Sequence, residues 1–286
     1  MIFENWKRYL EEGANLDYDR YAFVIEKTVF RGYNLILFDV NVLEKIMIGT
    51  YKREWKWALK NGIDWKDSMD RTNFLNSLSY EIRDRLEECI KGVIAIEKVL
   101  RDYGPCYREK GKTPYDIGMS AAIDKLGPMI YDFALQMVKF KGGAGLMADR
   151  SSVSKSASSV WQRYLDSGRG ATGIEVKSAR LDYEPTDNTT DTKKDDCEII
   201  GTGHKRSEKD LELGVNHIFY VDNVSSEFNS MGLRGQQITK ELKKKMVINI
   251  DGKDIKFPSI DLKPVLGSLG SFFFNKHYKG GALYPK

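Results

Sequence analysis

The chain has 286 residues, of which 41% are hydrophobic and 30% are charged, and its formal net charge at pH 7 is +4. This composition supports a packed core and excludes wholesale disorder. The sequence contains no run of about 18 apolar residues, so no membrane-spanning segment is predicted. Its small and dispersed positive charge does not indicate a nucleic-acid partner.

Cysteine and histidine are too few and too scattered to predict a metal site. The three cysteines, Cys89, Cys106 and Cys197, are odd in number and far apart, which argues against a disulfide framework and for a reducing compartment. The three histidines are equally dispersed, so no cluster has the spacing of zinc ligands.

The first ninety residues are predicted to be mainly helical. Helices are expected over residues 4–12, 18–30, 41–62 and 66–90. In the second of these, Tyr21, Val24, Ile25 and Val29 fall on one helical stripe. A short apolar run at residues 33–40, YNLILFDV, is typical of a strand.

The pattern then changes to strand, loop, strand, tight turn, helix, short strand and helix. The predicted elements are strands at 89–100 and 115–122, a helix that opens at Gly127, a very short strand within 141–149 and a helix over 154–168. Val and Ile dominate the first strand. Pro128 suits the first turn of its helix, where its missing N–H is not needed.

The last third of the chain mixes strand candidates with polar segments. Strands are predicted within residues 173–183, 215–224 and 244–257. The Asp-Gly pair at 251–252 predicts a hairpin in the last of these. Residues near 184–197 are predicted to form an exposed polar loop. The Phe triplet at 272–274 is too apolar to remain in water, so it is expected to pack on the body or on a partner.

Two stretches carry a resemblance to known proteins. The strand, glycine turn and helix at 115–140, with the short strand and helix that follow, resemble the core of the GNAT N-acetyltransferase superfamily. GPMIYDFA at 127–134 and GLMADRSSVSKSASSVWQRY at 145–164 are similar to a set of tailed-phage proteins with a GNAT-like core, whose function is not established. The resemblance covers roughly residues 90–200.

The predicted fold class is therefore α/β, with a mixed sheet of the α+β type. Its predicted parts are an N-terminal helical and α/β segment over 1–87, a GNAT-like core over 88–170 and a C-terminal extension over 171–286. The helices before the core and the apolar C-terminus are candidate interfaces.

The resemblance implies an acyl-CoA-dependent N-acyltransferase with acetyl-CoA as its cofactor. The turn that would hold the pyrophosphate is predicted at Lys125, Leu126, Gly127, Met129 and Ile130, because a helix N-terminus favours anions. Tyr164 takes the position of a general acid that protonates the leaving thiolate in this superfamily.

A second group of polar residues is predicted at the ends of the strands. It consists of Tyr131, Asp132, Asp149 and Arg150, and α/β proteins often bind ligands at such a place. An alternative interpretation leaves Asp149 and Arg150 as an ion pair that fixes the loop before the last helix.

The turn departs from the family pattern, which keeps a second function open. Asp124 stands where the family has a Gln or Arg, and an acid repels phosphate. Met129 stands where a small residue is expected, and Pro128 removes one N–H donor. The alternative is a non-catalytic phage protein without a cofactor, associated with the virion or bound to a host protein. Either protein is expected in the host cytoplasm or in the phage particle.

A third interpretation is a nuclease of the PD-(D/E)xK type. Glu175 and Lys177 have the required spacing on a predicted strand, and Asp149 or Asp166 would supply a further carboxylate for a divalent cation. A Glu-x-Lys triplet is common on exposed strands, so this signal is the weakest of the three.

Overall fold

The computed structural model describes the chain in several ranges. They are residues 17–28, 32–62, 85–99, 112–148, 153–180, 214, 217–243, 247–250, 252–256, 266, 270, 273, 274, 276 and 277. The helix predicted over 4–12, most of the helix predicted over 66–90, the polar loop near 184–197 and the pair Asp149 and Arg150 lie outside them.

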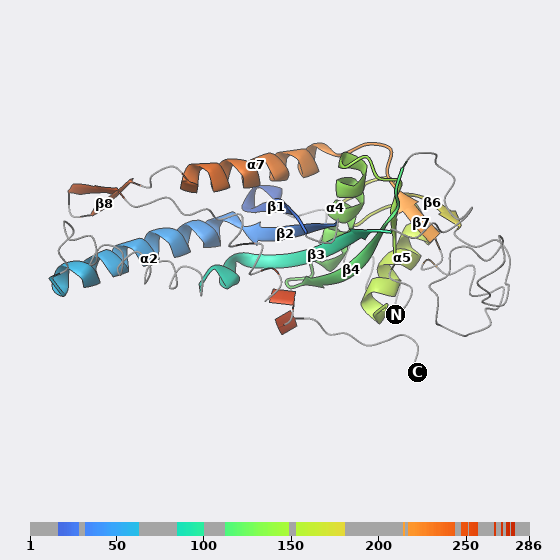
Figure 1. The fold of residues 1–286 in the computed structure, drawn as a ribbon. Helices are drawn as coiled ribbons and strands as arrows, with labels where there is room; N and C mark the ends of the chain where they lie inside the picture. The colour runs from blue at the N-terminus through green and yellow to red at the C-terminus, as the bar shows by residue number, and fades with distance from the viewer. Residues whose placement is uncertain are drawn as a thin grey trace.

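Seven strands form one mixed sheet in the order β1-β2-β3-β4-β5-β7-β6 (Figure 1). The strands are β1 Tyr21–Lys27, β2 Tyr33–Asp39, β3 Ile90–Lys98, β4 Tyr115–Ala122, β5 Leu146–Met147, β6 Lys177–Arg180 and β7 His217–Tyr220. Neighbours are antiparallel except β4 and β5, which are parallel. The mixed α/β class is confirmed, and strands from all three predicted parts of the chain join this one sheet.

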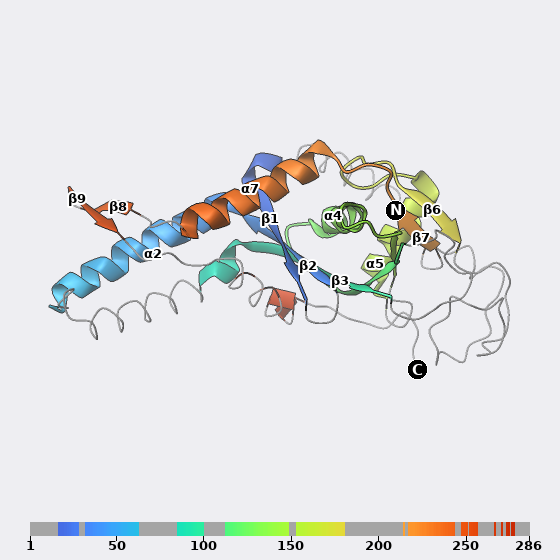
Figure 2. The same cartoon turned by 45° about the horizontal axis from the view of Figure 1, so that its top comes forward.

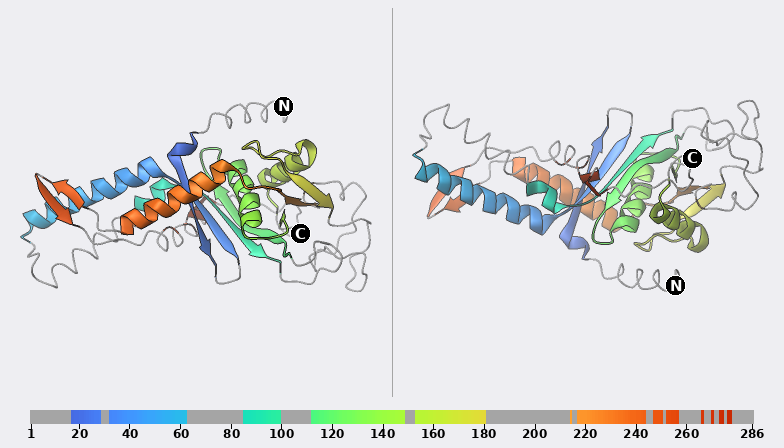
Figure 3. Two further views of the ribbon diagram at one scale, coloured as in Figure 1. Left: turned by 90° about the horizontal axis from the view of Figure 1, so that it is seen from above. Right: turned by 90° about the horizontal axis from the view of Figure 1, so that it is seen from below.

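Within the described ranges, four long helices and a separate hairpin accompany the sheet. They are α2 Val40–Lys60, α4 Gly127–Phe140, α5 Lys155–Ser167, α7 Ser226–Lys243 and the hairpin of β8 Val247–Ile250 with β9 Lys253–Lys256. Gly252 adopts a φ of +81° between the hairpin strands, as an Asp-Gly turn requires. Figures 1 and 3 show α2 and α7 extending beyond the same end of the sheet. No helix in the described ranges is long and apolar enough to cross a membrane.

Side chains alternate between two apolar layers along the strands, because successive residues of a strand point to opposite faces. Phe23 and Leu35 join the layer beneath α4, α5 and the start of α7. Val24 and Ile36 join the opposite layer, which α2 covers together with Leu266 and Phe273. Figure 2 shows α4 and α5 together on one side of the sheet.

The helix predicted over residues 18–30 is wrong in its described part. Residues Tyr18–Arg20 form a single 3-10 turn, and β1 follows and pairs with β2 from Tyr21↔Asp39 to Lys27↔Tyr33. Residues 21–24 are all buried, on alternate faces. A helix would bury only one stripe of this apolar run, whereas a strand between two layers buries both sides.

Helix α7 was not predicted, because its two interior glycines disfavour a helix. They have a packing role: a Cβ atom on Gly235 would lie 2.0 Å from the backbone oxygen of Phe23 in β1. Arg234 fixes the same contact, since its Nη1 donates to the backbone oxygens of Tyr18 at 2.7 Å and Tyr21 at 2.8 Å. The glycine lets α7 lie directly on the edge strand.

We predict that Gly235→Ala destabilises the protein, because the new methyl group would collide with the backbone of β1. The expected loss in the free energy of unfolding is about 1–3 kcal/mol. The control is Gly49→Ala in α2, where a Cβ atom would meet nothing within 4 Å. That change should add about 0.5–1 kcal/mol. Urea denaturation measures both, and a gain in both variants would contradict the contact.

Candidate functional site

The turn between β4 and α4 has a strained backbone. Asp124 and Lys125 have φ values of 53° and 60°, and two successive residues with side chains seldom adopt this left-handed conformation. Lys91 of β3 holds the turn, because its oxygen accepts the N–H of Ile123 at 3.0 Å and its Nζ pairs with Asp124 at 3.2 Å. Retained strain of this kind is often associated with function.

The predicted phosphate turn is only partly free to bind an anion. The N–H of Leu126 donates to Ile123 and the N–H of Ile130 donates to Leu126. Within the described ranges, the N–H groups of Gly127 and Met129 have no acceptor. The Met129 side chain is buried in the core, so it does not crowd the turn as the sequence suggested.

Strand β4 has a free edge next to this turn. It pairs with β5 only at Tyr115↔Leu146 and Asp116↔Met147. A bulge places Gly118 as an extra residue opposite the Ala95–Ile96 step of β3. From Ile117 to Ala122, no described strand pairs with the β5 side of β4. The backbone groups there are available to a ligand.

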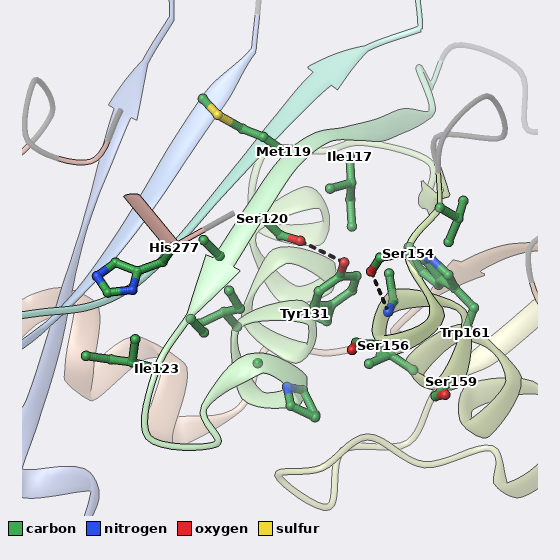
Figure 4. A pocket seen from close by; sticks show the side chains of 18 of the residues that line it. Ile117, Met119, Ser120, Ile123, Tyr131, Ser154, Ser156, Ser159, Trp161 and His277 are labelled. Atoms are coloured by element: carbon green, nitrogen blue, oxygen red, sulfur yellow. Dashed lines mark hydrogen bonds between the residues drawn. The ribbon is translucent and has the colours of Figure 1, made fainter. Parts of the chain in front are cut away.

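A pocket of about 710 Å³ lies at this edge, within the usual size range for small-molecule sites. Its walls are β4 and the turn (residues 117–124), the start of α4 (127, 128, 130 and 131), the start of α5 (153, 154, 156, 157 and 159–161) and His277. Figure 4 shows hydroxyl-bearing side chains on its walls, among them Ser120, Tyr131, Ser154 and Ser156. None of the described lining residues is Lys or Arg.

Tyr131 is the residue of the predicted polar group that lines the pocket. Its hydroxyl lies 2.8 Å from the hydroxyl of Ser120 on β4. Its ring meets the ring of Trp161 on α5 edge to face, with 5.5 Å between the centroids. Tyr131 therefore connects the three elements that form the pocket.

Asp132 and Tyr164 belong to a buried network behind the pocket. Asp132 is completely buried, and it accepts hydrogen bonds from the Tyr164 hydroxyl at 2.7 Å, the Thr172 N–H at 2.6 Å and the Thr172 hydroxyl at 2.8 Å. Burial raises the pKa of Asp132, and these three hydrogen bonds oppose that rise.

The geometry gives no support to Tyr164 as a general acid. Burial, with the neighbouring Asp132 carboxyl, raises the pKa of Tyr164 well above its ordinary value of 10.0. The side chain is 2% exposed and is not among the pocket residues. Its hydroxyl proton is directed to Asp132 and away from any ligand in the pocket.

Lys125 also lies apart from the pocket, since it is exposed and does not line it. One lining residue, His277, lies outside the sequence that resembles a known family. The only sequence signal for its place was the apolar C-terminal segment, which was expected to pack on the body or on a partner. Leu266 and Phe273 are buried in the second apolar layer, so that segment packs on the body and brings His277 to β4.

The described residues of the nuclease interpretation, Glu175, Lys177 and Asp166, do not form a carboxylate cluster. Glu175 forms an isolated β-bridge with Arg169, and Lys177 forms an ion pair with Asp222. Asp166 accepts a hydrogen bond from Gln162 on the exposed side of α5. In the ranges that the structure describes, no three His, Cys, Asp or Glu side chains are grouped so that they could hold a metal ion.

Comparison with models of protein families, with curated proteins and with solved structures finds no match to this chain. What the pocket binds must therefore be inferred from its own geometry and from the motifs in the sequence. Among the described residues, the geometry provides a strand edge without a strand partner, the N–H group of Gly127 at a helix start, a cluster of hydroxyl groups and one imidazole.

We predict that the stability lost by Tyr164→Phe depends on pH. The folded state holds the pKa of Asp132 above its ordinary value of 3.8, so this carboxyl contributes stability at low pH that is lost as the pH rises through the raised pKa. Phe at position 164 removes a donor to the carboxylate, and the pKa of Asp132 rises further. The stability difference should be small at a pH below the raised pKa and should grow to about 1–3 kcal/mol as the pH rises through it.

The control for this prediction is the same change in an Asp132→Asn background. An amide does not titrate, so the effect of Tyr164→Phe should then be independent of pH. Chemical denaturation at several pH values measures the free energy of unfolding of the parent protein, of each single variant and of the double variant. An equal pH dependence in both backgrounds would show that another group is responsible.

Proposed function

We propose that this chain is a phage-encoded protein with a GNAT-like fold that binds an acyl-CoA and transfers its acyl group to an amine. The observation that carries the proposal is the pocket at the free edge of β4, between the first turns of α4 and α5. The order β4, turn, α4, β5, α5 is the one that the sequence resemblance implies for an acyl-CoA site. The phage origin rests on the motifs at 127–134 and 145–164 alone.

The pocket offers two kinds of backbone contact that suit an acyl-CoA. The edge from Ile117 to Ala122 presents N–H and C=O groups, and an extended ligand with amide groups can add to such an edge as a strand would. The pantetheine arm of CoA has two amides. The N–H group of Gly127, a lining residue at the start of α4, suits a phosphate oxygen.

The turn repels a phosphate group less strongly than the sequence suggests. Lys91 pairs with Asp124 at 3.2 Å, which offsets the negative charge of this carboxylate. Because no described Lys or Arg lines the pocket, affinity for the pyrophosphate would depend on backbone N–H groups and on hydroxyl groups such as those of Ser154 and Ser156. We therefore expect micromolar and not nanomolar binding.

An acyl-CoA supplies an activated thioester, and the chain supplies its orientation. The apolar wall includes Ile117, Val160 and Trp161, and it excludes water from one side of a bound acyl group. The paired hydroxyls of Ser120 and Tyr131 lie on the pocket wall, where they can donate to an oxygen or sulfur atom of a ligand.

The second candidate is a non-catalytic virion-associated or host-interaction protein. The observation that favours it is the exposed apolar surface of the two projecting helices. Trp57 and Ile48 on α2 are 51% and 43% exposed, and Leu233 on α7 is 65% exposed. Apolar side chains on surfaces that extend from a fold suit contact with another protein.

We predict that acetyl-CoA and free CoA bind with micromolar dissociation constants and that Ser156→Trp weakens this binding by about tenfold or more. Ser156 is exposed and lines the pocket, so the indole would fill the ligand's space without entering the core. Ser230→Trp is the control, because Ser230 is exposed on α7 and is not a lining residue.

Isothermal calorimetry and thermal shift measure the binding. The control should bind as the parent protein does. Absence of any thermal shift at millimolar CoA or acetyl-CoA would overturn the acyltransferase proposal and favour the interaction protein.

A further inference from the structure

The C-terminal segment brings an imidazole to the pocket from a distant part of the chain. Leu266 is completely buried and Phe273 is 1% exposed in the layer that α2 covers. The ring of His277 packs on the ring of Phe273 with 4.4 Å between the centroids. Lys276 pairs with Glu87 at 2.7 Å, so the segment has both an apolar and an ionic anchor.

His277 lies on the opposite side of β4 from the hydroxyl groups. Figure 4 shows its ring on the side where Met119 and Ile123 project, with Ser120 and Tyr131 on the other side of the strand. All five residues line the same pocket. The pocket therefore continues around the free edge of β4 and has two compartments.

Two compartments suit a reaction between two substrates. The compartment beside α4 and α5 has the N–H group of Gly127 at the helix start and would take the acyl-CoA. The compartment of Met119, Ile123 and His277 would then take the acceptor, and the two substrates would meet at the edge of β4. An acceptor amine is an ammonium ion at neutral pH, so it must lose a proton before it can react.

We propose that His277 is the general base that takes this proton, and that the acceptor is a primary amine attached to an apolar group. This inference rests on the proposed acyl transfer. The amine loses one proton to the imidazole, which passes it to solvent. Its nitrogen then bonds to the thioester carbonyl carbon, the C–S bond breaks, and the second nitrogen proton goes to the sulfur. The products are an amide, free CoA and one proton.

Imidazole suits this step because it changes charge between about pH 5 and 8. The other titratable side chains that line the pocket are Asp124 and Tyr131, and Glu87 and Lys276 pair beside the histidine. Asp124 is engaged with Lys91. Among the described lining residues, His277 is the only nitrogen base.

The test uses the full chain with acetyl-CoA and n-butylamine as probes. His277→Gln should lower kcat/KM for butylamine by about 10²–10⁴-fold, while the dissociation constant of acetyl-CoA measured by calorimetry stays within about twofold of the parent value. Free imidazole in solution should restore part of the activity of His277→Ala.

A contact that does not depend on turnover provides a second measurement. With free CoA bound, no reaction occurs, and added butylamine should shift the NMR signals of the His277 ring. The control is Ser230→Gln, because Ser230 is exposed on α7 and does not line the pocket, so its kinetics and NMR shifts should match those of the parent protein.

The outcomes separate this inference from the proposed function. Failure of acetyl-CoA to bind overturns the acyl transfer and the role of His277 with it. Binding without turnover of butylamine, an unchanged kcat/KM in His277→Gln, or no NMR shift overturns the role of His277 and leaves the acyl-CoA site standing. An equal loss of activity in Ser230→Gln would show that the loss does not come from removing the imidazole.

Discussion

The pocket depends on one buried carboxylate. Asp132 of α4 accepts the hydroxyl of Tyr164 on α5 and two donors of Thr172 in the segment that follows α5. A completely buried carboxyl without such partners would be strongly destabilising. The network therefore fixes α4 and α5 relative to each other, and these two helices set the width of the space beside β4. The network also requires a glycine at position 170, since a Cβ atom on Gly170 would lie 2.5 Å from a carboxylate oxygen of Asp132.

The free edge of β4 follows from the same arrangement. Strand β5 pairs with β4 at two positions only, and after it the helices and not a strand lie beside β4. Unpaired strand edges are usually covered or paired. Here the edge lines a pocket, and the bulge at Gly118 changes the direction of the side chains along it. A paired edge would leave no room for a ligand, so the short β5 is the structural condition for the site.

Local signals in the sequence predicted much of the fold. The caps Ser154 and Gly168 fixed α5 to the residue, since the Ser154 hydroxyl accepts the Ala157 N–H and Gly168 adopts a φ of 62°. The same signals failed for Tyr21–Lys27, because an apolar run that is buried on two faces also contains a helical stripe. They failed for α7, because Gly232 and Gly235 are required by a contact with β1 that no local pattern reveals.

Only the part of the site that is formed by residues adjacent in the sequence could be predicted. The motif at Gly127 located the turn and the start of α4, but its alignment also suggested that Tyr164 would face a ligand. Whether a helical residue faces the pocket or the core depends on what packs behind it. Tyr164 faces the core, where its hydroxyl donates a hydrogen bond to the buried carboxyl of Asp132. Tyr131, one residue before Asp132, faces the pocket. The position of His277 in the pocket could not be predicted from the sequence, because it depends on how the C-terminal residues pack across the sheet.

This division has a consequence for what the protein recognises. The residues of the proposed acyl-CoA site form the compartment beside α4 and α5. The other compartment ends at His277, which lies outside the resembling region and is positioned by Phe273 and by the pair of Lys276 with Glu87. A donor common to many enzymes needs a common site, whereas an acceptor particular to one enzyme needs contacts of its own. Selection among acceptors would then depend on the C-terminal segment, whose residues can change without disturbing the turn proposed to hold the donor.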